Sequence, residues 1–227
     1  MAILIKNTRD ISLQGLKALV YGPAGIGKTT LCASADDTIV ISAEKGLLSI
    51  KEAEVDYIEI TSLADLGEAY HYVIQSQYKT ICFDSISDVA EVVLSELLKD
   101  YKDPRQAYGD MADKITAIVR LFRDIDGFNV VFTSKERRLV NESGVVSYVP
   151  SCPGKQLPEA LPYLFDLVMP MQIGKLEDGT KYRYLQTETG RRYIAKDRSG
   201  KLNPIEEPHL QKLFDKISGI NSTEKEK

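Results

Sequence analysis

Short apolar runs alternate with segments of helical periodicity along the chain. The runs that resemble buried strands cover 16–22, 38–42, 56–60, 80–84 and 129–133. The apolar positions that predict two helices are Leu63, Leu66, Tyr70 and Val73 for the first, and Met111, Ile115, Ile118, Phe122 and Ile125 for the second. A further helix is expected over 86–99. This alternation predicts an α/β fold with a mostly parallel central sheet flanked by helices.

The pattern changes after Phe165. Apolar or alternating runs at 167–173, 181–186 and 192–195, separated by Glu-Asp-Gly and Glu-Thr-Gly turns, predict antiparallel strands added at the C-terminal side of the sheet. A last helix is expected over 207–217. The segment 1–14 carries no readable chemistry beyond an edge strand expected at Ile3–Lys6. We therefore expect a single domain over 1–217, followed by a polar tail at 218–227.

Two segments lack a regular pattern. Residues 100–109 predict a polar loop with proline, glycine and exposed aromatic residues. Residues 139–155 contain two glycines and two prolines, which predicts a hairpin or a mobile loop.

Composition narrows the class of protein. The chain has 227 residues, 43% of them hydrophobic and 27% charged, as in an ordinary globular domain. No apolar run is long enough to cross a bilayer, and the N-terminus lacks the pattern of a signal peptide. We therefore expect a cytoplasmic protein without a membrane partner. Cys32, Cys82 and Cys152 have no metal-ligand spacing and imply no disulfide framework.

The charge is unevenly distributed. The net charge of −4 argues against uniform attraction to nucleic acid. The segment from Lys175 to Lys201, however, holds more Lys and Arg than Asp and Glu, which permits a local basic patch. Tyr and Arg residues gather there, and they fit either bases stacked beside phosphate-binding cations or ordinary cross-strand pairs. These residues are Tyr182, Arg183, Tyr184, Arg191, Arg192 and Tyr193.

One motif organises the chain. Residues 22–29 match a phosphate-binding loop, two glycines separated by four residues and followed by Lys and Thr, and they lie between a predicted strand and a predicted helix. The glycines let backbone N–H groups face phosphate oxygens, and the following helix adds its positive end. Lys28 can neutralise the β- and γ-phosphates of ATP, and the Thr29 hydroxyl can bind Mg²⁺. The expected nucleotide-binding residues are Gly22, Pro23, Ala24, Gly25, Ile26, Gly27, Lys28, Thr29 and Thr30.

An acidic residue ends the strand expected at 80–84. By itself Asp84 is equally typical of a helix N-cap. In one domain with a phosphate loop, a carboxylate at the end of a strand indicates the second side of a Mg²⁺ site, usually through water.

The order of these motifs resembles the RecA-type ATPase core. A phosphate loop is followed by a strand ending in Glu44, a strand ending in Asp84, and a strand running into Ser134 and Lys135. The resemblance implies that Glu44 polarises the attacking water, although a surface residue fits the same sequence. Lys196 and Arg198 resemble the Lys-x-Arg segment of DnaB-type helicases, which reaches the γ-phosphate in the neighbouring subunit. The alternative for these two cations is a solvated hairpin end.

In size the chain looks most like short phage-encoded RecA-core proteins that assist single-strand annealing, a resemblance that covers about residues 15–205. It implies an ATPase that binds single-stranded DNA, forms a homo-oligomeric ring or filament with ATP at subunit interfaces, and works in the bacterial host cytoplasm. A single-strand-binding protein is a further expected partner. The loops at 101–109 and 138–154 correspond to the DNA-facing loops, with Lys135, Arg137 and Arg138 at the root of the second.

The chain departs from RecA at one position. RecA has a Gln that senses the γ-phosphate where this chain has Ser134 and Lys135, and a lysine lacks the amide's ability both to donate and to accept. Two other function classes stay open. One is a small-molecule kinase that uses the same loop, with Arg137 and Arg138 in a lid. The other is a nucleotide-dependent assembly or adaptor protein with little turnover.

Overall fold

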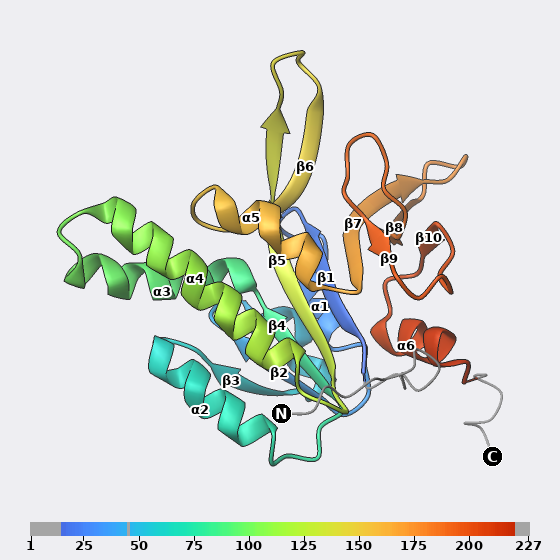
Figure 1. The fold of residues 1–227 in the computed structure, drawn as a ribbon. Coiled ribbons are helices and arrows are strands. Elements are labelled where there is room, and N and C mark those ends of the chain that lie inside the picture. Colours follow the sequence, from blue (N-terminus) through green and yellow to red (C-terminus); the bar gives the residue numbers. More distant parts are fainter. Residues whose placement is uncertain (1–14, 45, 221–227) are drawn as a thin grey trace, which may run out of the picture.

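The computed structural model describes residues 15–44 and 46–220, and its centre is a mixed sheet (Figure 1). The expected strand at Ile3–Lys6 and most of the predicted tail lie outside the described residues. The strands are β1 Lys17–Gly22, β2 Thr38–Ser42, β3 Asp56–Glu59, β4 Thr80–Asp84, β5 Asn129–Val140, β6 Val146–Ser151, β7 Leu167–Lys175, β8 Lys181–Gln186, β9 Lys196–Asp197 and β10 Ile205–Glu206. The helices are α1 Lys28–Cys32, α2 Leu63–Val73, α3 Ile86–Asp100, α4 Pro104–Arg123, α5 Gln156–Ala160 and α6 Leu210–Ser218, with 3₁₀ turns η2 Leu47–Ala53 and η3 Leu161–Leu164.

The strand order is β10-β8-β7-β1-β5-β4-β2-β3. The strands from β7 through β3 pair in parallel, whereas β8 pairs with β7 and β10 pairs with β8 in antiparallel fashion. Strand β9 also pairs with β7, and β6 pairs with the second half of β5. The expected α/β fold class is therefore confirmed: a mostly parallel sheet, helices on its faces, and antiparallel strands on the C-terminal side.

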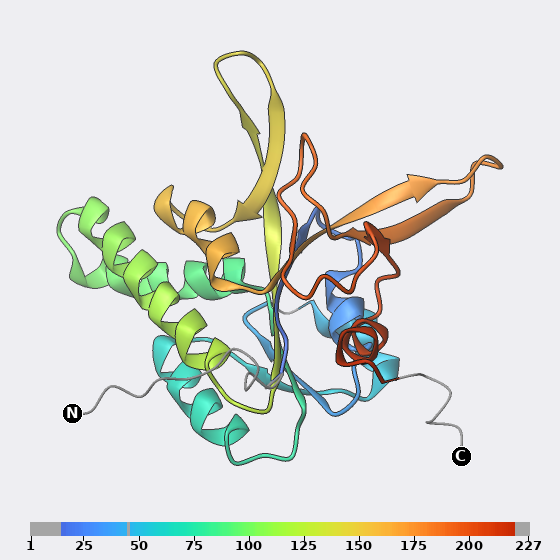
Figure 2. The same ribbon diagram turned by 45° about the vertical axis from the view of Figure 1, so that its right-hand side comes forward.

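Each face of the sheet buries its own apolar layer, because successive strand residues point to opposite sides. Phe83 and Phe132 point toward the face covered by α2, α3 and α4, where their rings stack with centroids 4.3 Å apart. Their neighbours Cys82 and Val131 point to the other face, toward α1 and α6. Figure 2 shows the two helical layers on opposite sides of the sheet.

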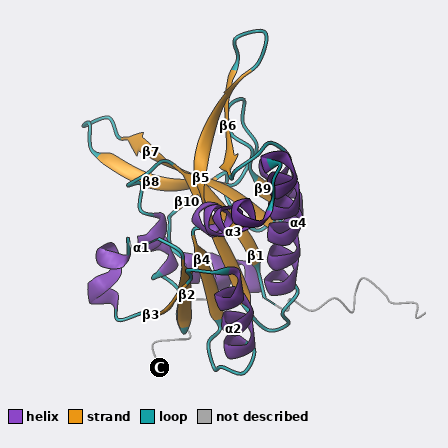
Figure 3. Ribbon diagram, turned by 90° about the vertical axis from the view of Figure 1, so that its left-hand side faces the viewer, coloured by secondary structure: helices purple, strands orange, loops and turns teal. Residues whose placement is uncertain are grey.

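Two hairpins extend beyond the helical layers. β5 continues past the sheet and pairs with β6, and β7 continues past the sheet and pairs with β8. Figure 3 shows both hairpins rising from the same edge and diverging. Because β1, β2 and β4 are parallel, their carboxyl ends also meet at this edge, where the predicted chemistry lies.

Three predicted elements differ from the structure. The loop expected over 100–109 is mostly helix, because Pro104 occupies the first turn and the Asp103 carboxylate caps the Arg105 N–H (3.0 Å). The strand expected at 192–195 makes only an isolated bridge from Tyr193 to Tyr148. The last helix begins at Leu210, three residues later than predicted.

Within the described part of the chain, no helix is both long and apolar enough to span a bilayer.

Candidate active site

Residues 22–30 comprise the end of β1, a tight loop over 23–27 and the start of α1. Gly27 has φ +107°, a conformation that residues with a Cβ rarely adopt. A Cβ on Gly22 would lie 2.9 Å from the backbone oxygen of Met171, so strand β7 also requires glycine there. Ile26 is buried and anchors the loop. The solvent-exposed positions of the loop are Pro23, Ala24, Gly25 and Thr30.

Lys28 extends its ammonium group back across the loop. Its Nζ donates to the carbonyl oxygens of Gly22 and Pro23, both at 2.9 Å. Burial lowers the pKa of Lys28, and the nearby carboxylates of Asp84 and Glu44 oppose this shift. Helix α1 has only five residues, so its dipole is small and the loop amides must supply most of the phosphate contacts.

Thr29 and Asp84 meet at the mouth of the loop. The Thr29 hydroxyl donates to one Asp84 carboxylate oxygen (2.6 Å), and the Thr133 hydroxyl donates to the other (2.6 Å). Asp84 is only 3% exposed, and its peptide bond to Ser85 is cis. Two hydroxyls therefore fix the orientation of this buried carboxylate.

This donor set fits Mg²⁺. Mg²⁺ prefers oxygen ligands and keeps several waters, and Thr29 and Asp84 present a hydroxyl and a carboxylate to one point. No group of three or more His, Cys, Asp or Glu among residues 15–44 and 46–220 could hold a metal ion by itself. Thr29 and Asp84 would therefore hold the ion together with phosphate and water oxygens. When bound, Mg²⁺ neutralises negative charge on the phosphates.

Glu44 lies just beyond β2. The Ser42 hydroxyl holds its backbone, accepting the Glu44 N–H (3.2 Å) and lying 2.7 Å from the Glu44 carbonyl oxygen. The same hydroxyl is 2.9 Å from the carbonyl oxygen of Asp84, so Ser42 ties the two strand ends together. Partial burial and the negative charges of Asp88 and Asp84 raise the pKa of Glu44. The exposed Glu44 side chain therefore interacts electrostatically with Asp84 and Asp88. A carboxylate with a raised pKa fits a group that accepts a proton from water.

Lys135 borders this site and is already paired. Its Nζ lies 2.6 Å from Asp88 and 3.4 Å from Glu91. Partial burial lowers the pKa of Lys135, but these two carboxylates outweigh it and the net shift is upward. This placement does not support the DNA contact expected for Lys135. The residue instead fixes Asp88 next to Glu44.

The remaining predicted DNA-binding cations lie on the β5–β6 hairpin. The guanidinium of Arg137 donates to the carbonyl oxygen of Gly154 (3.1 Å), so this side chain braces the root of the hairpin. Arg138 points elsewhere and is exposed. Of the two, only Arg138 is free to meet a ligand on this hairpin.

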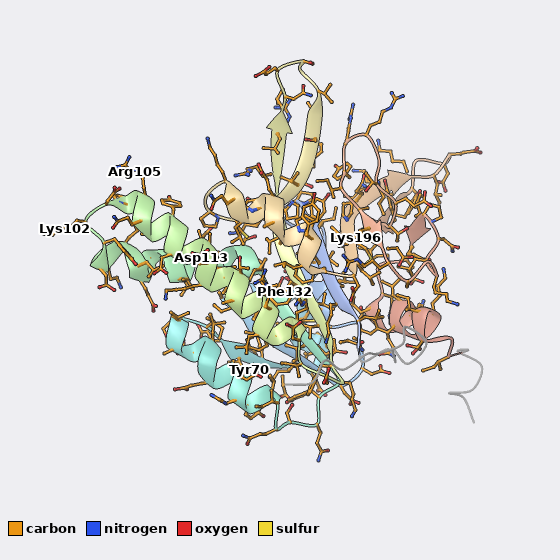
Figure 4. All side chains as sticks on the ribbon, in the orientation of Figure 1. Tyr70, Lys102, Arg105, Asp113, Phe132 and Lys196 are labelled. Carbon is orange, nitrogen blue, oxygen red and sulfur yellow. The ribbon has the colours of Figure 1, made fainter. Side chains whose placement is uncertain are left out.

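Lys196 and Arg198 lie away from the loop of their own chain. The Nζ of Lys196 donates to the carbonyl oxygen of Pro162 (2.6 Å), and Arg198 forms an ion pair with Asp166 (3.3 Å). Asp166 donates its N–H to the carbonyl oxygen of Lys17, the first residue of β1. Arg198 therefore lies at the amino end of the sheet, opposite the phosphate loop. Figure 4 labels Lys196 on the same side of the molecule as β9.

Five residues of the site were not predicted. Three of them position the predicted groups: Thr133, Ser42 and Asp88. Their polar character at or just past the ends of buried strands is the sequence feature that could have indicated them. Glu136 has a carboxylate oxygen that is buried without a hydrogen-bond partner among the described residues, and burial raises its pKa. Arg183, from β8, lies against Gly27. The positions of Glu136 and Arg183 in the site follow only from the folded structure.

One comparison with known proteins shows the family of this chain. The family model described as an AAA domain (AAA_24) matches residues 14–199. The chain belongs to this AAA-domain family. The AAA domain thus includes the phosphate loop, Glu44, Asp84 and the Lys196–Arg198 segment in one matched region.

No curated protein matches the sequence of this AAA domain. Among solved structures, a KaiC-like protein from the hyperthermophilic archaeon Pyrococcus horikoshii OT3 is similar, with 15% identity and a TM-score of 0.45. That similarity covers 76% of this chain and 78% of the archaeal one. A likeness at this level carries no information about function. The chain is a P-loop NTPase by its family and its loop; its substrate and its cellular role have to be inferred from the site.

Proposed function

We propose that this AAA domain hydrolyses ATP with Mg²⁺, binds single-stranded DNA, and promotes annealing or strand exchange in phage homologous recombination. One observation carries the proposal: strand β5 runs without interruption from the nucleotide site into the basic hairpin. Thr133 on this strand orients Asp84, and five residues later Arg138 is exposed at the root of the hairpin. A shift of β5 at the nucleotide site would therefore also move Arg138, on a surface that can contact DNA.

The chemistry assigns each part of the nucleotide site a task. Lys28 neutralises the phosphate oxygens, Thr29 and Asp84 hold the metal ion, and Glu44 accepts the proton of the attacking water. The raised pKa of Glu44 suits this last task, because a base with a pKa nearer neutrality accepts a proton more readily.

A shallow cavity supports the DNA-binding part of the proposal. The start of α4 and the loop after β6 border a cavity of about 230 Å³, which is lined by Arg105, Tyr108 and Lys155 among others. A Cβ on Gly154 would lie 3.7 Å from the Tyr108 ring, and this ring remains 41% exposed. An exposed aromatic ring between cations is the arrangement that stacks bases beside phosphates. Arg105 pairs with Asp103 (2.8 Å), but its side chain is 91% exposed, so a phosphate can replace this surface partner. Figure 4 shows Arg105 and Lys102 near the free end of the α3–α4 pair.

The position of Arg198 supports an oligomer. A cation at the amino end of the sheet cannot reach the loop of its own subunit without unfolding β9, but it can face the loop of a neighbouring copy. We infer a homo-oligomer, a ring or a filament, with ATP at subunit interfaces. A single-strand-binding protein is a further partner in this proposal.

The deciding experiment measures ATP hydrolysis with and without single-stranded oligonucleotides, together with annealing of complementary strands. We expect DNA to increase hydrolysis and the protein to accelerate annealing. A double variant Arg105→Gln/Arg138→Gln should weaken DNA binding and reduce the salt slope by about one per lost phosphate contact. Arg120→Gln is the matched control, because Arg120 is exposed at the other end of α4.

Three outcomes would contradict the proposal. Transfer of the γ-phosphate to a small-molecule acceptor instead of water would favour a kinase. Nucleotide binding without turnover, with or without DNA, would favour an adaptor. An equal loss of DNA affinity in the Arg120→Gln control would show that the cavity is not the DNA-binding site.

A further inference from the structure

The β7–β8 hairpin packs directly onto the phosphate loop. Strand β7 is parallel to β1, with Pro170 opposite Tyr21, and the next residue of β7, Met171, approaches the loop closely. A Cβ on Gly27 would lie 3.5 Å from the terminal methyl group of Met171. The loop is thus covered on this side by the hairpin of its own chain.

Arg183 is the cation that this hairpin brings to the loop. It lies opposite Ile173 in the β7–β8 register. A Cβ on Gly27 would lie 3.6 Å from both Cδ and Nε of Arg183, so the side chain rests on the loop itself. Within the described part of the chain, its guanidinium makes no hydrogen bond or ion pair with another residue.

Three other cations considered for the nucleotide or for DNA are engaged. Lys28 donates to two loop carbonyls, Lys135 pairs with Asp88, and Arg198 pairs with Asp166. Arg183 therefore differs from each of them: it touches the phosphate loop and keeps all its donors free.

We propose that Arg183 is a further nucleotide-binding residue, which donates to the α- or β-phosphate of the nucleotide held by its own subunit. A guanidinium presents a planar set of donors that matches phosphate oxygens, and charge-assisted bonds of this kind are strong. The amides of a phosphate loop surround the α- and β-phosphates, whereas its lysine reaches the β- and γ-phosphates. Because Arg183 rests on Gly27, its partner is a phosphate that ATP and ADP share.

This assignment rests on the proposed nucleotide-binding function and adds two things to it. It separates a cation acting within one subunit, Arg183, from the cations Lys196 and Arg198 that act on the neighbour. It also removes Arg183 from the set of Tyr and Arg residues weighed for DNA stacking on β8. Tyr182 and Tyr184, its sequence neighbours, lie on the other face of that strand, with ring centroids 5.8 Å apart.

The test compares Arg183→Gln with the matched control Lys181→Gln. Both are exposed residues on the same face of β8, but Lys181 lies two residues closer to the tip of the hairpin. Glutamine keeps much of the side-chain stem on Gly27 and removes the charge. Affinities for ATP and for ADP are measured by isothermal titration on the full chain.

We expect Arg183→Gln to weaken ATP and ADP binding alike, by roughly 10- to 100-fold. Lys181→Gln should stay within about twofold of the wild type, as expected for an exposed charge with no contact. Unchanged affinity in Arg183→Gln, a loss confined to ATP, or an equal loss in Lys181→Gln would each overturn the assignment. If the wild type itself bound neither nucleotide, the underlying nucleotide site would be wrong, and that result is distinct from these three.

Discussion

Lys17 begins strand β1, Lys28 follows the loop at the other end of that strand, and the two lysines make the same kind of contact. Lys28 donates to two carbonyl oxygens of the phosphate loop, and Lys17 donates to those of Ile125 (2.9 Å) and Phe128 (2.7 Å). Burial lowers the pKa of both, to about 8 for Lys17. Hydrogen bonding and burial alone therefore do not distinguish a phosphate-binding lysine from a structural one.

The surroundings distinguish them. Beside Lys28 lie exposed glycine-rich backbone and the Thr29–Asp84 pair, which together can meet a phosphate and a metal ion. Beside Lys17 the chain closes tightly, since a Cβ on Gly15 would lie 1.9 Å from the backbone oxygen of Phe128. The cavity there, about 380 Å³, mixes cations with the carboxylates of Asp124, Asp126 and Asp166. A phosphate site needs accessible backbone amides next to a cation, and the exposed loop beside Lys28 provides both, whereas the tightly packed chain beside Lys17 does not.

The largest expected effect links the two ends across a subunit interface. Arg198→Ala should keep the fold and ATP binding but lose hydrolysis by roughly 10³–10⁵-fold, because the γ-phosphate charge in the neighbouring subunit loses a stabilising cation. Steady-state turnover measures this loss. Mixing Arg198→Ala with Lys28→Ala subunits should partly restore activity. If mixtures shown to co-assemble never exceed the sum of the separate activities, Arg198 does not act in trans.

The second effect tests which carboxylate near Lys28 is the base. Glu44→Gln keeps the shape of the side chain and removes the proton acceptor, so hydrolysis should fall by about 10²–10⁴-fold while ATP still binds. Glu136→Gln is the matched control, since Glu136 also lies near Lys28 but has a buried oxygen. We expect it to keep most of the single-turnover rate. The reverse ranking would move the role of base to Glu136.

The third effect compares the two lysines directly. Lys28→Ala should weaken ATP binding by roughly 10²–10³-fold, because a half-buried phosphate cluster loses its compensating charge. Lys17→Ala should bind ATP with wild-type affinity. It should instead lower the urea midpoint of unfolding, since the carbonyl oxygens of Ile125 and Phe128 lose their hydrogen-bond donor. Equilibrium titration and urea denaturation separate these outcomes. A comparable loss of ATP affinity in Lys17→Ala would show that the two ends of the sheet are not independent.

The smallest effect concerns pH and stability at the amino end. The pKa of Lys17 is about 8 in the folded chain and about 10.5 in the unfolded chain, so between these values the unfolded chain binds more protons. Stability from this residue therefore rises with pH across that window. The gain is on the order of 1 kcal/mol, because water reaches part of the side chain and screens the shift. Lys17→Met should lack this rise in denaturation curves at pH 8, 9 and 10. An identical pH dependence in both proteins would place the Lys17 pKa at its ordinary value.

Much of the fold and part of the site follow from local sequence pattern. Short buried strands and amphipathic helices repeat with fixed periods, and the phosphate loop specifies its own backbone through Gly25 and Gly27. Asp84 was predicted from its position at a strand end in one domain with a phosphate loop, and Glu44 from the resemblance to the RecA-type core. The helix starting at Pro104 was missed because proline and aspartate fit a loop as well as a helix start.

By itself, the sequence determined the mostly parallel sheet, the phosphate loop and the meeting of Thr29 with Asp84, since each depends on residues close together in the chain or on strand ends that the topology must align. Only the tertiary structure decided that Lys135 pairs with Asp88, that Arg198 lies at the far end of the sheet, and that Arg183 rests on Gly27. Those contacts join residues from 32 to more than 150 positions apart, and no local preference of either partner encodes the register and twist that bring them together.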